Sequence, residues 1–360
     1  MNLAYFFQLF LTSFIFAFFA FPIFIRVLEK YDILDSPGKR KIHKSHTPSV
    51  GGVPVFFGIL ATLIIWWPAE VLGQYKIFLS SLALMFLIGL RDDLIPLKAT
   101  QKLVSQLIPV ALIVVSGLAI IPSFYGLLGG WNFYLIISIP ITMFTLIVMI
   151  NSINLIDGSD GLAASLGLLI ISFFAFWFYL NGETGLSILS ITFIGAFLAF
   201  LFFNWQPSKI FMGDTGALIL GFTIAFLTIS FMNSNYILEE GNPIKFTATI
   251  TTSFCILFVP LFDTLRVFII RIRSGVSPFT ADKNHVHHVL IRYGLDHAQV
   301  AILLVLVNAS FIGLAILSRN ISDYVMIPVI LFLSIAISFF LDLLLQKKLH
   351  KSRKRKINVA

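Results

Sequence analysis

Apolar runs separated by short polar segments occupy the chain from residue 3 to residue 345. A helix needs about 20 predominantly apolar residues to cross the hydrocarbon core of a bilayer. We therefore expect an all-α, polytopic integral membrane protein with about eleven transmembrane helices. The predicted spans cover residues 3–27, 52–69, 77–90, 103–122, 132–150, 162–180, 184–203, 215–233, 246–270, 298–318 and 323–345.

The composition supports a membrane protein without a separate soluble domain. Of the 360 residues, 58% are hydrophobic and 12% are charged, whereas a soluble domain has about 25% charged residues. We expect one transmembrane catalytic domain over residues 1–345 and a basic cytoplasmic tail over 346–360. The single cysteine, Cys255, excludes a disulfide framework and a thiolate metal site.

The distribution of Lys and Arg predicts the orientation. With the N-terminus outside and the C-terminus in the cytoplasm, 22 of the 25 basic residues lie in cytoplasmic segments, as the positive-inside rule requires. Only Lys76, Lys245 and Arg319 lie on the far side. The tail is either a plain topology signal or a contact for anionic lipid headgroups. Because topology explains the net charge of +8, nucleic acid is not an expected partner.

Two adjacent carboxylates, Asp92 and Asp93, end the third apolar run. An ionised carboxylate within a bilayer costs roughly 3 kcal/mol on insertion scales, and neighbouring like charges also repel. One interpretation is a cap for the fourth helix, with Arg91 as a neutralising neighbour. The other is a magnesium site, because Mg²⁺ takes one or two carboxylates together with phosphate oxygens. Lys102, nine residues after Asp93, is then a candidate phosphate ligand.

The stretch "NSINLIDGSDGLA" places four polar side chains three residues apart, Asn151, Asn154, Asp157 and Asp160. This spacing predicts one face of a helical turn, and the glycines between them allow close backbone approach. An ordinary turn rich in Asn, Asp and Gly is the alternative. The stretch "FNWQPSKIFMGDTGAL" adds Asp214 at the edge of a span and Phe211, which either stacks on a base or belongs to the interfacial aromatic belt.

Three histidines cluster in the loop after the ninth run, His285, His287 and His288. They suit phosphate oxygens or a metal; a zinc site would need closed tetrahedral ligation, so we favour a pyrophosphate contact. Asp263 and Arg266, three residues apart, predict a structural ion pair. Together, the cytoplasmic loops predict a divalent-metal site for a phosphate-bearing substrate, with a lipid as the acceptor.

Five stretches between residues 35 and 288 resemble the polyprenyl-phosphate N-acetylhexosamine-1-phosphate transferases. They read "DSPGKRKIHKSHTPSVGG", "GLRDDLIPLKATQK", "NSINLIDGSDGLA", "NWQPSKIFMGDTG" and "SPFTADKNHVHH". The superfamily also contains the phospho-MurNAc-pentapeptide transferases, which have fewer spans and three consecutive histidines followed by Phe and Glu. Here that place reads "HVHHVL", which favours the branch that primes O-antigen, enterobacterial common antigen or teichoic acid.

The resemblance implies a reaction and its partners. A UDP-N-acetylhexosamine, with GlcNAc the first choice of sugar, and undecaprenyl phosphate would give undecaprenyl-diphospho-HexNAc and UMP. Mg²⁺ would be the cofactor, with Mn²⁺ as a substitute. The enzyme would lie in the bacterial inner membrane among membrane lipids, with its active site facing the cytoplasm. A homodimer is left open.

The resemblance also implies roles for individual residues. The expected catalytic residues are Asp92, Asp93, Asp157 and Asp214, of which Asp93, Asp157 and Asp214 are the expected metal ligands. The expected substrate contacts are Lys102, Asn154, Asp160, Asn204, Phe211, His285, His287, His288, Lys41 and His43. Ser49 stands where many relatives have an arginine, so a basic contact there is not expected.

Two rivals from other classes are weaker. A transporter or channel would carry acids in mid-span and on both sides of the membrane, whereas 12 of the 17 acids lie at or beyond the predicted cytoplasmic ends. An intramembrane zinc enzyme would use the histidine cluster, and its activity after metal removal would return with Zn²⁺ instead of Mg²⁺.

Overall fold

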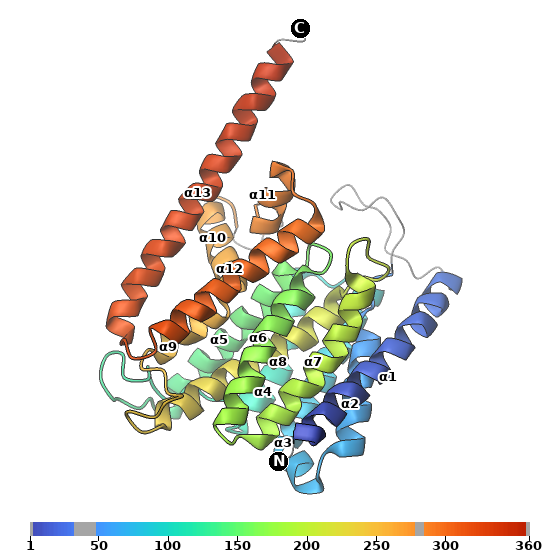
Figure 1. Cartoon of the computed structure of the whole chain (residues 1–360), viewed down its shortest axis with the longest axis vertical. Helices are drawn as coiled ribbons and strands as arrows, with labels where there is room; N and C mark the ends of the chain where they lie inside the picture. The colour runs from blue at the N-terminus through green and yellow to red at the C-terminus, as the bar shows by residue number, and fades with distance from the viewer. Residues whose placement is uncertain (1–2, 32–47, 278–283, 358–360) are drawn as a thin grey trace.

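The computed structural model describes the backbone of residues 3–31, 48–277 and 284–357, and the side chains up to residue 343. This part of the chain forms helices and no strand, which confirms the all-α prediction (Figure 1). The helices are α1 (Leu3–Lys30), α2 (Gly52–Trp66), α3 (Ala69–Leu94), α4 (Ala99–Val115), α5 (Leu135–Ile156), α6 (Leu162–Leu180), α7 (Thr184–Asn204), α8 (Gly213–Ile237), α9 (Thr249–Ile256), α10 (Phe258–Arg273), α11 (Val286–Tyr293), α12 (His297–Leu317) and α13 (Asp323–Ile357).

The helices form a bundle whose length matches a membrane. In the described residues, eight helices are long and apolar enough to cross a bilayer, and the bent pair α9–α10 would make nine. The apolar helices α2 and α4 are shorter, with 15 and 17 residues. The predicted eleven spans are obtained when α2, α4 and the bent pair are each counted as one span in addition to the eight long helices. This count stays a prediction. The N- and C-termini lie at opposite ends of the molecule (Figure 1).

Several boundaries differ from the prediction. Helix α3 has 26 residues, because its first turns carry polar residues that an apolar run excludes. Helix α4 ends at Val115, and two isolated β-bridges follow it, Ser123 with Asn132 and Gly126 with Gly129. Helix α13 continues to Ile357 and so runs through most of the predicted tail.

The predicted ninth span is interrupted at Leu257, where α9 and α10 meet at 88°. A break inside an apolar bundle exposes backbone groups that must find partners. Asn308 of α12 supplies them, because its amide donates to the Ile256 carbonyl (2.9 Å) and its oxygen accepts from the Val259 N–H (3.0 Å). Pro260 lies in the first turn of α10, where the missing N–H is tolerated.

Helix α8 is the centre of the bundle. Its most apolar 18-residue window is entirely buried, and it packs against α2, α3, α5 and α6. Small residues allow the closest approaches, as is typical of membrane helices. A Cβ added to Gly89 of α3 would lie 2.5 Å from the Thr215 Cα, and one added to Gly52 would lie 2.2 Å from the Gly216 nitrogen.

We expect Gly89→Ala to lower the unfolding free energy by about 1–3 kcal/mol, because the new methyl group meets the backbone of α8. Gly313→Ala on α12 is the matched control, since no atom lies within 4 Å of its added Cβ. This control should leave stability unchanged or raise it by up to about 1 kcal/mol. Thermal unfolding of the detergent-purified variants measures both, and equal midpoints would contradict the packing argument.

Candidate active site

Most of the predicted site residues meet at one end of the bundle. The ends of α3, α5 and α7 and the beginnings of α4 and α8 come together there, because short loops connect consecutive helices. The segments thus joined carry Asp92, Asp93, Lys102, Asn154, Asp157, Asp160, Asn204, Phe211 and Asp214. Lys41 and His43 lie outside the described residues.

The Asp93 carboxylate holds the first turn of α8. Its Oδ1 accepts from the Asp214 N–H (2.6 Å), and its Oδ2 accepts from the Thr215 N–H (2.9 Å) and hydroxyl (2.5 Å). These are N–H groups that a helix start cannot satisfy internally, and the helix dipole favours a negative charge beside them. The alternative that this Asp pair caps the fourth helix is wrong, because the N-cap of α4 is Lys98.

The chain before α2 is joined to the chain before α8. The Phe211 N–H donates to the Pro48 carbonyl (2.8 Å), and the Gly51 N–H donates to the Phe211 carbonyl (3.0 Å). Gly213 has a positive φ of 68°, and a Cβ there would overlap the Ser49 carbonyl oxygen at 1.8 Å. Phe211 is therefore fixed by its backbone, and its side chain is partly exposed.

Lys102 lies between two carboxylates from different helices. Its Nζ is 3.2 Å from the Asp92 Oδ2 and contacts the Asp214 Oδ1. The Asn154 side-chain NH₂ donates to the same Asp214 oxygen (2.7 Å). The Asn154 side-chain oxygen lies 3.4 Å from the Lys102 Nζ. The other Asp92 oxygen accepts from the Leu97 N–H (2.7 Å). Three predicted substrate or catalytic residues therefore surround one lysine ammonium.

The polar strip 151–160 is not a single helical face, because α5 ends at Ile156. Asn151 points within the bundle, where its amide donates to Gln106 (2.8 Å). Asp157 lies just after the helix end, and no donor among the described residues holds its side chain. Burial, together with the charges of Asp214, Asp93 and Asp160, raises the pKa of Asp157 to about 8.

Asn204 and His297 fix the turn at Asp160. Asn204 accepts from the Gly161 N–H (2.9 Å) and donates to the Ile210 carbonyl (2.9 Å), so it joins two loops. The Asp160 Oδ2 accepts from the Ser208 N–H (3.4 Å). His297 was not predicted; its Nδ1 lies 2.9 Å from the Ser159 hydroxyl, and no local sequence signal connects two residues so far apart.

The histidine cluster packs onto this turn. His287 is 1% exposed, and a Cβ on Gly158 would lie 2.3 Å from its Nε2. Both ring nitrogens lack a partner among the described residues. Burial, with the imidazoles of His288, His285 and His297 nearby, holds the pKa of His287 well below its ordinary value. A buried, neutral and unsatisfied imidazole is the state expected of a side chain that meets a ligand.

The predicted ion pair between Asp263 and Arg266 is wrong. The Asp263 carboxylate contacts the His285 Nδ1 at 2.9 Å, and Arg266 pairs with Asp342 of α13 at 2.7 Å. Spacing along one helix could not identify these partners, because both come from later segments of the chain.

The oxygen donors at this end fit a hard divalent cation. Four carboxyl groups, those of Asp92, Asp93, Asp157 and Asp214, lie close together near Lys102, which supplies more oxygen donors than one ammonium can satisfy. Within the described ranges, no three His, Cys, Asp or Glu side chains are arranged to hold a metal by themselves. Mg²⁺ requires only one or two protein carboxylates when phosphates complete its shell. Asp157 and Asp214 could supply them, because Asp93 is occupied by α8.

Comparisons with known proteins agree with this arrangement. The family described as glycosyl transferase family 4 matches residues 75–232, which include all four carboxylates. The chain is 32% identical over 332 residues to the probable undecaprenyl-phosphate N-acetylglucosaminyl 1-phosphate transferase of Bacillus subtilis (strain 168), covering 90% of this chain and 86% of the relative.

Two further relatives share most of the length. The undecaprenyl-phosphate alpha-N-acetylglucosaminyl 1-phosphate transferase of Escherichia coli (strain K12) is 29% identical over 346 residues, with 93% of this chain and 88% of the relative covered. The decaprenyl-phosphate N-acetylglucosaminephosphotransferase of Mycobacterium leprae (strain TN) is 29% identical over 318 residues, with 82% and 79% covered. The names of all three relatives include N-acetylglucosamine, and the acceptor named is undecaprenyl phosphate in two of them and decaprenyl phosphate in the third.

We expect Asp93→Asn to lower the unfolding free energy by about 1–2 kcal/mol, the usual cost of losing a helix cap. An amide can accept on only one atom, so it cannot satisfy all three donors of α8. Asp214→Asn should cost less than half as much, because in the described structure no backbone N–H depends on that side chain. Thermal unfolding in detergent compares them, and an unchanged midpoint for Asp93→Asn would refute the capping role.

Proposed function

Because the chain belongs to glycosyl transferase family 4, we propose that it transfers N-acetylglucosamine 1-phosphate from UDP-N-acetylglucosamine to undecaprenyl phosphate. An oxygen of the lipid phosphate attacks the sugar-bearing phosphorus, and the bond from that phosphorus to UMP breaks. The products are UMP and undecaprenyl-diphospho-N-acetylglucosamine. Such a product is the primer of a cell-envelope polysaccharide.

The cluster around Lys102 carries this proposal. Phosphoryl transfer depends mainly on positioning and charge stabilisation. In this cluster, four helices together contribute one ammonium, one amide and two carboxylates. Lys102 neutralises the phosphate oxygens of the acceptor, and Asp92, held by the Leu97 N–H, orients or deprotonates that phosphate. Asn154 keeps the Asp214 carboxylate in place.

Magnesium is the proposed cofactor, with manganese as a substitute. Asp157 and Asp214 would hold it together with diphosphate oxygens, and the bound ion would supply Lewis-acid stabilisation of the charge at phosphorus. The sequence suggested Asp93 as a third ligand. We assign it a positioning role instead, because both of its oxygens are bonded to the start of α8.

The remaining site residues complete a donor pocket. Phe211 offers a ring for the uracil, and Asp160 lies on the neighbouring turn. His287 has two unsatisfied ring nitrogens and packs against Gly158, which follows the Asp157 carboxylate in the chain. We therefore propose that the nucleotide lies near α7 and α8 and the sugar diphosphate between the carboxylates and the histidines.

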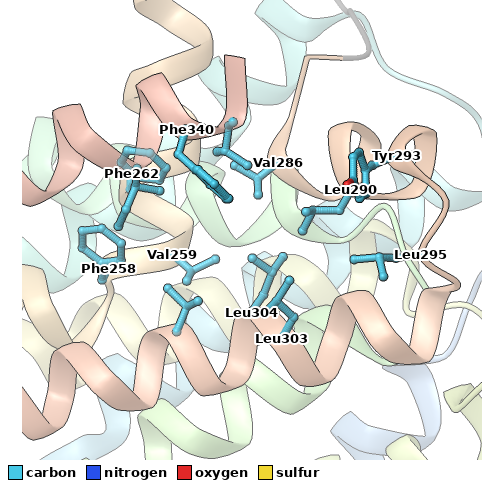
Figure 2. Close-up of a pocket in the computed structure, with 13 residues that line it drawn as sticks. Phe258, Val259, Phe262, Val286, Leu290, Tyr293, Leu295, Leu303, Leu304 and Phe340 are labelled. Carbon is cyan, nitrogen blue, oxygen red and sulfur yellow. The ribbon is translucent and has the colours of Figure 1, made fainter. Parts of the chain in front are cut away.

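An apolar cavity of about 410 Å³ lies beside the histidines and is proposed to hold part of the polyprenyl chain (Figure 2). Its walls come from α10, α11, α12 and α13, and its lining is almost entirely apolar. Val286 and Leu290 face the cavity from α11, the helix that also carries His287 and His288. The hydrocarbon and the reacting phosphate of one acceptor could therefore lie on neighbouring surfaces.

The orientation and location are part of the proposal. We propose that the candidate site faces the cytoplasm from a bacterial inner membrane, because the loops that carry it belong to the segments in which the sequence concentrates Lys and Arg. The donor nucleotide would then reach the site from the compartment that contains it. The far end of the bundle carries no comparable cluster in the residues that the structure describes.

The purified protein should release UMP when undecaprenyl phosphate is combined with UDP-N-acetylglucosamine. EDTA should abolish release, and Mg²⁺ or Mn²⁺ should restore it while Zn²⁺ should not. Asp214→Asn should reduce the rate by at least about 100-fold, because a proposed ligand of the metal is lost. Release of UMP with no added lipid, or full activity in EDTA, would contradict the proposal.

A bulkier side chain in the cavity should discriminate between acceptors. Leu304→Trp is expected to raise the KM for undecaprenyl phosphate about tenfold, since the ring occupies space for several methylene groups worth about 0.8 kcal/mol each. The KM for a short-chain isoprenyl phosphate should change little, because such a chain does not reach far into the cavity. The matched control is Leu317→Trp, at an 88% exposed position on the same helix. Equal effects on long and short acceptors would exclude this cavity as the lipid site.

A further inference from the structure

A buried carboxylate pairs with the first histidine of the cluster. Asp263 of α10 is 1% exposed and His285 is 6% exposed. The Asp263 Oδ2 lies 2.9 Å from the His285 Nδ1, and the Oδ1 accepts from the Val286 N–H at 2.8 Å. One carboxylate therefore holds both the backbone at the start of α11 and the imidazole beside it.

The imidazole contact fixes the chemistry of the ring. A carboxylate accepts and does not donate, so the proton of a neutral His285 must reside on Nδ1. The Nε2 is then an acceptor with a free lone pair. If Asp263 only capped α11, its bond to the Val286 N–H would be enough. Its additional contact with the His285 Nδ1 determines which nitrogen of that ring can accept a hydrogen bond.

Arg266 holds the same segment from the next turn of α10. Its guanidinium donates to the Asn284 carbonyl (2.9 Å) and to Asp342 of α13 (2.7 Å). The residues on both sides of His285 are thus fixed to α10, and the ring stacks 5.8 Å from that of His287. The imidazole is held in position as well as in one tautomer.

We propose that Asp263 is a positioning residue for donor-sugar recognition. It holds His285 with Nδ1 protonated, and the Nε2 accepts a hydrogen bond from a hydroxyl or amide N–H of the N-acetylhexosamine. This inference rests on the proposed function. A diphosphate oxygen cannot be the partner of that nitrogen in the neutral ring, because both atoms are acceptors. The hydroxyls and the amide of the sugar have suitable hydrogens. The uracil N–H and the ribose hydroxyls also donate, but UMP carries them too, so its affinity separates the nucleotide from the sugar.

Asp263→Asn tests the proposal, because an amide in that place favours the opposite tautomer. When its oxygen accepts from Val286, its NH₂ faces Nδ1 and moves the ring proton to Nε2, as in a carboxylate-to-amide change beside a catalytic histidine. The KM for UDP-N-acetylglucosamine should rise about tenfold or more, the cost of one lost hydrogen bond in a buried site. Affinity for UMP, which has no sugar, should change less than about twofold.

A matched control separates this role from stability. Asp323 is 5% exposed and accepts from the Ile250 and Thr251 N–H groups at the start of α9, at the end of the bundle away from α11 (Figure 1). Asp323→Asn should lower the thermal midpoint while the donor KM stays at the wild-type value. The double variant Asp263→Asn with His285→Ala should be no worse than His285→Ala alone.

The outcomes distinguish the inference from the function it rests on. A wild-type protein that releases no UMP from any UDP-sugar would refute the proposed function. An active wild type in which Asp263→Asn weakens UMP binding as much as it raises the donor KM would show a general collapse of the loop and overturn the inference. Additive effects of Asp263→Asn and His285→Ala would overturn it as well.

Discussion

The bond between the Asp93 carboxylate and the first turn of α8 organises the whole site. Most of helix α8 is buried, and the N–H groups of its first turn need an acceptor that the helix itself does not supply. Asp93 provides that acceptor from the end of α3. The same contacts hold Asp214 beside Asp92 and Lys102, so the interaction that completes the start of a helix also brings charged groups together.

Much of the architecture could be predicted, because the bilayer imposes a length and a composition on each span. The polar residues at span ends then identified the end of the bundle at which the carboxylates and Lys102 meet. Local periodicity was a poorer guide to their geometry. The three-residue spacing of Asn151, Asn154 and Asp157 suggested one helical face. However, α5 ends at Ile156 before Asp157, and Asn151 bonds to Gln106 while Asn154 bonds to Asp214.

The contacts that define individual roles join residues far apart in the chain, and spacing carries no information about them. Asp263 and Arg266 have opposite charges and lie one helical turn apart, yet they do not pair with each other. Each is bonded to a residue from a later segment of the chain. Asn204 is used to connect two loops. His297 reaches the Asp160 turn only because α12 packs against α6. Such partners follow from tertiary packing, which the amino-acid pattern does not encode at short range.

The 88° bend at Leu257 has a consequence for how a long lipid is handled. If α9 follows the membrane normal, α10 runs nearly parallel to the membrane plane, and the apolar cavity beside it lies at the depth of the acyl chains near the surface. An acceptor could then diffuse in sideways from the surrounding leaflet with its hydrocarbon never exposed to water. Extraction into water would cost about 0.8 kcal/mol for each methylene, so lateral entry makes a very hydrophobic carrier a practical substrate for a polar reaction.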